Sequence, residues 1–108
     1  MPIEQWSDKI VVVHLADDPQ FSEDIESLGP AVRQHASIVL DFSGVRFVNS
    51  SNISQLLKIR KNITNTDARL LLCNVSNQVW GVLLITGLDK IFEFSDNVPT
   101  ALATLQME

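Results

Sequence analysis

Short apolar runs alternate with longer amphipathic segments along this chain. The runs are rich in valine, isoleucine, leucine and phenylalanine, which is typical of β-strands. Their nearly continuous apolar character is expected of strands in a parallel sheet that is covered on both faces. Residues 6–8 would form the turn of an N-terminal hairpin. The pattern predicts strands at 3–5, 10–15, 38–42, 69–75 and 91–94.

The segments between the runs carry apolar residues three or four positions apart, the spacing of one face of an α-helix. Asp18 or Ser22 can cap the first helix. Gly29-Pro30 interrupts it, and because proline lacks an amide donor and clashes with the preceding turn, we predict a break near Leu28. Helices are predicted over 18–35, 51–64 and 76–87, and from a cap at Ser95 or Asp96 onwards.

The helix at 51–64 is amphipathic, with Gln55 expected to face solvent. Its apolar stripe is predicted to comprise Ile53, Leu56, Leu57 and Ile63.

Strands that alternate with helices imply an α/β fold with a largely parallel sheet and right-handed crossovers. A hairpin at the N-terminus makes that sheet mixed. With 108 residues and 45% hydrophobic content, the chain can bury one core. We therefore predict a single domain over residues 1–108, with a mixed, mostly parallel sheet of four or five strands and about four helices.

Charge and residue usage exclude several classes of function. The formal net charge of -5 argues against nucleic-acid binding, which needs a basic surface. The sequence has neither a signal-peptide pattern nor an apolar run long enough to cross a bilayer, so we expect a cytoplasmic protein without membrane insertion. Cys73 stands in a strand run, where a free cysteine is usually a buried hydrophobe. His14 and His35 are far apart, so we predict no enzyme, metal site or cofactor.

A strand leads through a short loop to Ser50 and Ser51, which begin an amphipathic helix. A serine at a helix start can cap an unpaired backbone amide, which contributes about 1 kcal/mol. The same position tolerates phosphate, because free amides and the positive end of the helix dipole favour an anion. The spacing by itself favours the capping role. Asp41 is expected to order the turn into Ser43-Gly44 by accepting backbone hydrogen bonds.

Three segments occur in the order and at the spacing found in STAS domains, the family of anti-sigma factor antagonists: 40–53, 69–75 and 82–92. The family pattern is, roughly, strand, D-x-S-G-V-x-x-x-D-S-S-G, helix, strand, helix, T-G-L-x-x-x-F. The turn glycines Gly44 and Gly87 and the serine pair match this pattern. From about Ile10 onwards, the chain therefore resembles a STAS domain.

The resemblance implies a switch that binds an anti-sigma factor with serine kinase activity and so frees a sigma factor. Family members are phosphorylated on the second serine of the pair, which is Ser51 here, with Ser50 as the alternative. A phosphatase would reverse the modification. Two positions depart from the family: Asn49 replaces an aspartate beside the target serine, and Asn52 replaces a glycine and adds a side chain where a kinase or partner approaches.

The first contact loop of the family is acidic, so the resemblance implies that Asp17 or Asp18 meets a basic group on a partner; a solvated turn is the other interpretation. The predicted partner surface comprises Asp17, Asp18, Asn49, Ser50, Ser51 and Asn52. A second interpretation keeps the fold and changes the role. The chain would then be a non-phosphorylated docking subunit of a transporter or of a signalling assembly, which Asn49 and Asn52 favour.

The helix at 76–87 carries more apolar residues than one core-facing stripe requires. Trp80 and Leu84 form a second apolar pair one position further round the helix. The pair either widens the buried face, under the C-terminal helix with Leu102 and Leu105, or forms an exposed patch. An exposed patch would serve self-association or a second partner.

Overall fold

The computed structural model describes residues 3–107, and its strands form one five-stranded sheet in the order β1-β2-β3-β4-β5. β1 is antiparallel to β2, and all other neighbouring strands are parallel. The mixed, mostly parallel sheet predicted from the sequence is confirmed. The strands are β1 Ile3–Ser7, β2 Ile10–Ala16, β3 Ser37–Gly44, β4 Leu70–Cys73 and β5 Glu93–Ser95.

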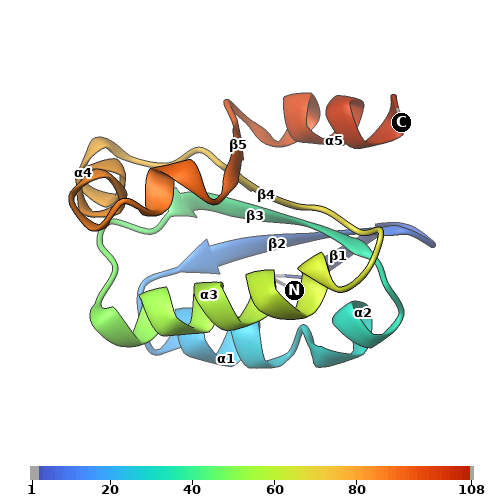
Figure 1. Ribbon diagram of the computed structural model, residues 1–108, viewed down its shortest axis with the longest axis horizontal. Helices are drawn as coiled ribbons and strands as arrows, with labels where there is room; N and C mark the ends of the chain where they lie inside the picture. Colours follow the sequence, from blue (N-terminus) through green and yellow to red (C-terminus); the bar gives the residue numbers. More distant parts are fainter. Residues whose placement is uncertain (1–2, 108) are drawn as a thin grey trace.

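Helices lie on both faces of the sheet and at one end of it (Figure 1). α1, α2 and α3 cover one face, α5 lies over part of the other, and α4 lies near the ends at which the parallel strands finish. A 3-10 turn, η1 at Leu88–Lys90, follows α4. The α-helices are α1 Gln20–Glu26, α2 Gly29–Arg33, α3 Ser50–Thr64, α4 Asn77–Thr86 and α5 Val98–Gln106.

The sheet buries apolar side chains on both faces, which explains the continuous apolar runs in the sequence. The larger core cluster includes Val13 and Leu72, whose side chains are fully buried, together with residues of α1, α3 and α4. A smaller cluster joins Leu102 and Leu105 of α5 to the opposite face of the sheet. Cys73 belongs to that cluster, and burial raises the pKa of its thiol to about 12. The cysteine is therefore the buried hydrophobe that we predicted.

The predicted break in the first helix is present. α1 ends at the C-cap Ser27, and α2 begins after the N-cap Leu28 with Pro30 in its first turn. A proline is tolerated there because the first amides of a helix have no intrahelical acceptor. Leu28 is 1% exposed and anchors the junction in the core.

Several strand boundaries differ from the prediction: β3 continues to Gly44 and not to residue 42, and β4 ends at Cys73 and not at residue 75. β1 continues through Ser7, which pairs with Ile10, so the hairpin turn lies at residues 8–9 and not at 6–8. β5 begins at Glu93, because the amide of Ile91 still bonds to the carbonyl of Leu88 in a turn that continues η1.

The cap of α5 is Asn97, and not Ser95 or Asp96 as predicted. The Oδ1 atom of Asn97 accepts a hydrogen bond from the amide of Thr100 at 2.9 Å. Asparagine at this position satisfies a first-turn amide as well as serine or aspartate does.

The buried face of α3 also differs from the prediction. Leu57 is 36% exposed and Ile53 is only partly buried, whereas Gln55 is partly buried and not solvated. Because the side chain of Asn52 points inward, the buried stripe of α3 begins at residue 52 and not at residue 53. The buried residues of α3 are Asn52, Leu56, Ile59 and Ile63.

Gly44 ends β3 at a point where no side chain fits. It pairs with Ala16, and a Cβ atom at this position would lie 2.7 Å from the carbonyl oxygen of Leu15. The glycine therefore lets β2 and β3 stay close at the edge from which the functional loops leave.

We expect Gly44→Ala to destabilise the domain by roughly 1–3 kcal/mol, because backbone must move to admit the methyl group. Gly81→Ala is the matched control: nothing lies within 4 Å of its Cβ position, and it sits inside α4. That control should stabilise the fold by about 0.5–1 kcal/mol. Urea unfolding measures both, and equal effects of the two variants would contradict the close-approach argument.

Candidate functional site

Ser50 and Ser51 are the first two residues of α3, and both are exposed. This confirms that Ser51 lies in the first helical turn and is accessible. Among the described residues, neither serine donates a hydrogen bond from its amide, and neither hydroxyl makes one. Two amides and two hydroxyls are therefore available at a helix start, where the dipole favours an anion.

The helix cap is built by two asparagines and not by a serine. The side chain of Asn49 accepts a hydrogen bond from the amide of Asn52 at 2.8 Å, and the side chain of Asn52 accepts one from the amide of Asn49 at 3.1 Å. Asn52 is 2% exposed. The expectation that its side chain lies on the approach surface is therefore wrong: the side chain points inward and completes the reciprocal cap.

Asp18 ties the β2–α1 loop to this cap. Its Oδ2 atom accepts hydrogen bonds from the side-chain amides of Asn49, at 3.2 Å, and Asn52, at 2.9 Å. Its Oδ1 atom accepts from the amide and hydroxyl of Ser22, at 3.0 and 2.7 Å. Hydrogen bonds from Ser22, and then from Asn52, lower the pKa of Asp18 to about 2. Of the two predicted caps, it is therefore Asp18, and not Ser22, that accepts a hydrogen bond from a backbone amide in the first turn of α1.

Asp17 makes a parallel connection to the β3–α3 loop. One carboxylate oxygen accepts from the amide of Arg46 at 2.9 Å, and the other accepts from its Nε at 2.8 Å. The side chain of Asp17 is 17% exposed, whereas that of Arg46 is 82% exposed. The side-chain hydrogen bond from Arg46 lowers the pKa of Asp17. The two loops therefore form one connected surface around the start of α3.

Comparison with known proteins decides the family. The family model described as "STAS domain" matches residues 7–101. The chain belongs to the STAS domain family.

Solved structures with the same fold come from anti-sigma factor antagonists. A STAS domain protein of this kind from Planctomyces limnophilus has a TM-score of 0.82 and 21% identity, covering 96% of this chain and 97% of that one. The unphosphorylated antagonist SpoIIAA has a TM-score of 0.82 and 20% identity, covering 98% and 96%. The phosphorylated Bacillus SpoIIAA has a TM-score of 0.73 and 21% identity, covering 98% and 97%. At these identities, the likeness establishes the fold.

A polar network that sequence reasoning missed lies beneath the loop of this STAS domain. His14 bonds through Nδ1 to Asp41 and through Nε2 to Glu4, both at 2.7 Å. Asp41 also accepts from the side chain of Asn74 at 2.9 Å and, as predicted, from the amide of Ser43 at 3.0 Å. Polar residues near the carboxyl ends of two adjacent apolar strands were the available signal. The network connects β1, β2, β3 and the end of β4.

The charge of His14 should stabilise the fold. The hydrogen bonds that His14 donates to Glu4 and, second in importance, to Asp41 raise the pKa of His14 above its usual 6.5. For Asp41, burial acts to raise the pKa, but hydrogen bonds from Asn74 and His14 and from the Ser43 amide outweigh it and lower the pKa.

We therefore expect the free energy of unfolding to fall as the pH rises through the raised pKa of His14. The cationic form contributes stability below pH 6.5, where histidine is charged in both the folded and unfolded chain, and the contribution disappears once folded His14 loses its proton. The His14→Gln variant should not show this fall in the free energy of unfolding. Urea unfolding at pH 5.5, 6.5, 7.5 and 8.5 measures both proteins, and parallel pH profiles would contradict the prediction.

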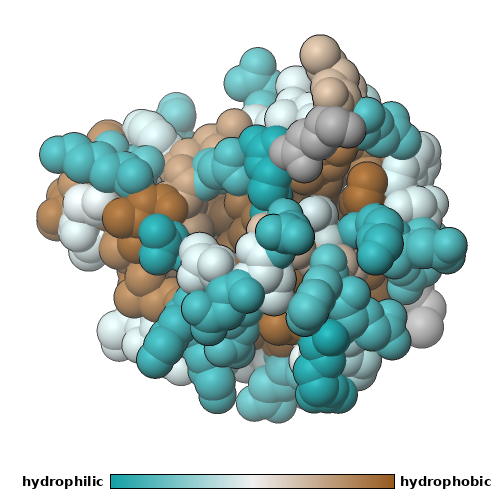
Figure 2. Space-filling view, turned by 45° about the vertical axis from the view of Figure 1, so that its right-hand side comes forward, coloured by the Kyte–Doolittle hydropathy of each residue, from teal (hydrophilic) through white to brown (hydrophobic). Residues whose placement is uncertain are grey.

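Trp80 and Leu84 do not form one surface. Trp80 is partly buried and packs edge-on against Phe94, with ring centroids 5.0 Å apart. Leu84 is 50% exposed and its neighbour Ile85 is 88% exposed. A shared buried face under α5 is not what the structure shows, because the α5 leucines belong to the other core cluster. Figure 2 shows a largely hydrophilic face with apolar atoms gathered toward the side where α4 lies.

Other kinds of site have no counterpart in the part of the chain that the structure describes. Residues 3–107 contain no group of three or more potential metal ligands. No helix within these residues is long and apolar enough to cross a membrane. A hollow of about 510 Å³ lies between α1, α2 and α3, but neither Ser50 nor Ser51 lines it. The exposed start of α3 is therefore the candidate functional site.

Proposed function

We propose that this STAS domain is a cytoplasmic, non-enzymatic anti-sigma factor antagonist that regulates transcription by binding an anti-sigma factor with serine kinase activity. Phosphorylation of Ser51 would end the binding, with Ser50 as the alternative site, and a phosphatase would restore it. The observation that carries the proposal is the exposed hydroxyl of Ser51 beside two unused helix-start amides. Asn49 supplies the cap, which leaves the serines free for another role.

The physical basis of the switch is a charge added to a surface made for a neutral hydroxyl. A phosphoserine carries about -1.5 to -2 charges at pH 7. The helix start can accommodate this charge through its amides and dipole, so the fold survives. A partner packed against Ser51 would meet both the bulk and the charge, and binding would be lost. The fold and the interaction therefore respond differently to one modification.

A second candidate keeps the fold without phosphorylation, as a docking subunit of a transporter or of another signalling assembly. Asn49 favours it, since the family pattern has an aspartate beside the target serine. Neighbouring genes discriminate between the two: a kinase-type anti-sigma factor supports the first candidate, and a permease supports the second. Copurification of the tagged chain followed by mass spectrometry tests the same choice at the level of protein.

Ser51→Asp should change the free energy of unfolding by less than about 1 kcal/mol, because a negative charge suits a helix start. It should nevertheless weaken binding to the anti-sigma factor. A melting curve and a binding isotherm measure the two effects. Ser50→Asp places the same charge one residue earlier and tests the alternative site.

The kinase reaction gives an independent readout. Incubation with the anti-sigma kinase and ATP should add one phosphate, which Ser51→Ala abolishes and Ser50→Ala retains. Strong destabilisation of Ser51→Asp with unchanged affinity would mean that Ser51 is structural only.

A second surface on α4 is also proposed, for self-association or another partner. Leu84 and Ile85 supply its exposed apolar side chains. Trp80 is only partly exposed and packs against Phe94, so its contribution is indirect. Exposed apolar patches on small domains often mark contact sites.

Leu84→Glu should therefore lower the apparent mass in sedimentation, or remove one copurifying protein, without unfolding the chain. Met107→Glu is the matched control, since Met107 is 85% exposed and lies outside α4. Sedimentation profiles of Leu84→Glu that match the wild type, with no copurifying protein lost, would exclude the patch.

A further inference from the structure

Arg46 and Phe47 project from the β3–α3 loop next to the proposed Ser51 surface. The residues on either side of them point inward: Val45 is 2% exposed, and Val48 packs against the main core cluster. The guanidinium side chain of Arg46 is 82% exposed, and Phe47 is 60% exposed. Two adjacent outward side chains thus stand on a backbone that is held in the core on both sides.

Hydrogen bonds fix how Arg46 is presented. Asp17 accepts from both its backbone amide and its Nε, which holds the base of the guanidinium against the domain. Among the described residues, the two terminal nitrogens of Arg46 donate no hydrogen bond. An arginine held in this way keeps its outer N–H groups available and loses little further freedom on binding.

The same contacts change the expected chemistry of the partner. The sequence predicted that Asp17 or Asp18 meets a basic group, but both carboxylates are occupied by groups of this chain. Asp17 bonds to Arg46, and each oxygen of Asp18 already accepts two hydrogen bonds. The outward donors at this place belong to Arg46. Their planar arrangement suits a carboxylate, which can accept two parallel hydrogen bonds.

We propose that Arg46 and Phe47 anchor the partner in the surface beside Ser51, and that they fit a protein carrying a carboxylate next to an apolar pocket. Aromatic residues and arginine are the side chains most often found at the energetic centre of interfaces. The side chain of Phe47 belongs to neither core cluster, so packing within the domain does not account for an aromatic residue at this position. The inference rests on the proposed function, in which the surface around Ser51 binds an anti-sigma factor.

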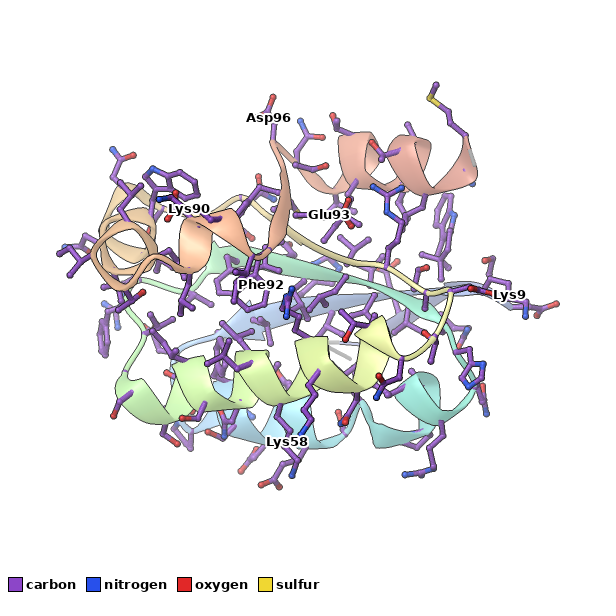
Figure 3. All side chains as sticks on the ribbon, in the orientation of Figure 1. Lys9, Lys58, Lys90, Phe92, Glu93 and Asp96 are labelled. Carbon is purple, nitrogen blue, oxygen red and sulfur yellow. The ribbon has the colours of Figure 1, made fainter. Side chains whose placement is uncertain are left out.

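The first test uses the purified anti-sigma factor identified by copurification. Phe47→Ala should weaken its binding about tenfold or more, as expected for an aromatic anchor that becomes buried when the partner binds. Arg46→Gln should weaken binding and also reduce its dependence on salt concentration, because a charged contact is removed. The matched controls are Leu57→Ala, at another exposed apolar residue, and Lys9→Gln, which makes the same charge change. Lys9 lies at the end of the molecule opposite the start of α3 (Figure 3).

Circular dichroism melts establish that each variant is folded before its affinity is compared. Unchanged affinities of folded Phe47→Ala and Arg46→Gln would overturn the inference and leave the proposed function standing. Failure of the wild-type chain to bind any anti-sigma factor would instead defeat the proposed function.

A second probe tests the surface without that partner. The peptides acetyl-Leu-Glu-Leu-amide and acetyl-Leu-Lys-Leu-amide are titrated into the labelled domain at millimolar concentration and followed by NMR. The glutamate peptide should shift the amide signals of residues 46–48, and the lysine peptide should not. Equal shifts with both peptides, or none with either, would overturn the inference.

Discussion

The parallel pairing of β2 with β3 determines where the candidate residues around Ser51 lie. Their register brings Ile10 opposite Ser37 and His14 opposite Asp41, so both strands finish at one edge of the sheet. The loops that follow them must then leave side by side. Gly44 permits the close approach at that edge, because any Cβ atom there would meet the Leu15 carbonyl. The contacts of Asp17 and Asp18 with the β3–α3 loop follow from this geometry.

The two departures from the STAS pattern, Asn49 and Asn52, form one hydrogen-bonded group with Asp18. An aspartate at position 49 could cap the amide of Asn52 equally well, but it would face the Asp18 carboxylate where Asn49 now donates a hydrogen bond. A glycine at position 52 would lose both the return half of the cap and the second amide on Asp18. Asn49, Asn52 and Asp18 therefore satisfy one another. Neutral amides at both positions let a carboxylate sit against the helix start.

This arrangement separates residues that hold the surface from residues that a partner can reach. Asp18 and Asn52 use their polar atoms within the domain, and Asp17 holds Arg46. Ser50, Ser51, Arg46 and Phe47 remain exposed on a loop and helix start that are fixed from below. The His14 and Asp41 network supports the same loop through the Ser43 amide. A surface prepared in this way needs little reordering when a protein binds, which is how local rigidity contributes to affinity.

The sequence by itself determined the α/β class, the mixed sheet, the helix break near Leu28, the burial of Cys73 and the place of Ser51 in a first helical turn. Each depends on local periodicity, on proline chemistry or on the order of segments, all of which are written in neighbouring residues. Only the tertiary structure decided that Asn49 caps α3, that Asn52 is buried, and that Leu57 is exposed. It also decided that the two aspartates of the β2–α1 loop bond to groups of this chain: Asp17 to Arg46, and Asp18 to the two asparagines. The reciprocal cap itself joins residues only three positions apart. The contacts of Asp17 and Asp18 join residues about thirty positions apart, and they exist only once parallel strands bring the two loops to the same edge.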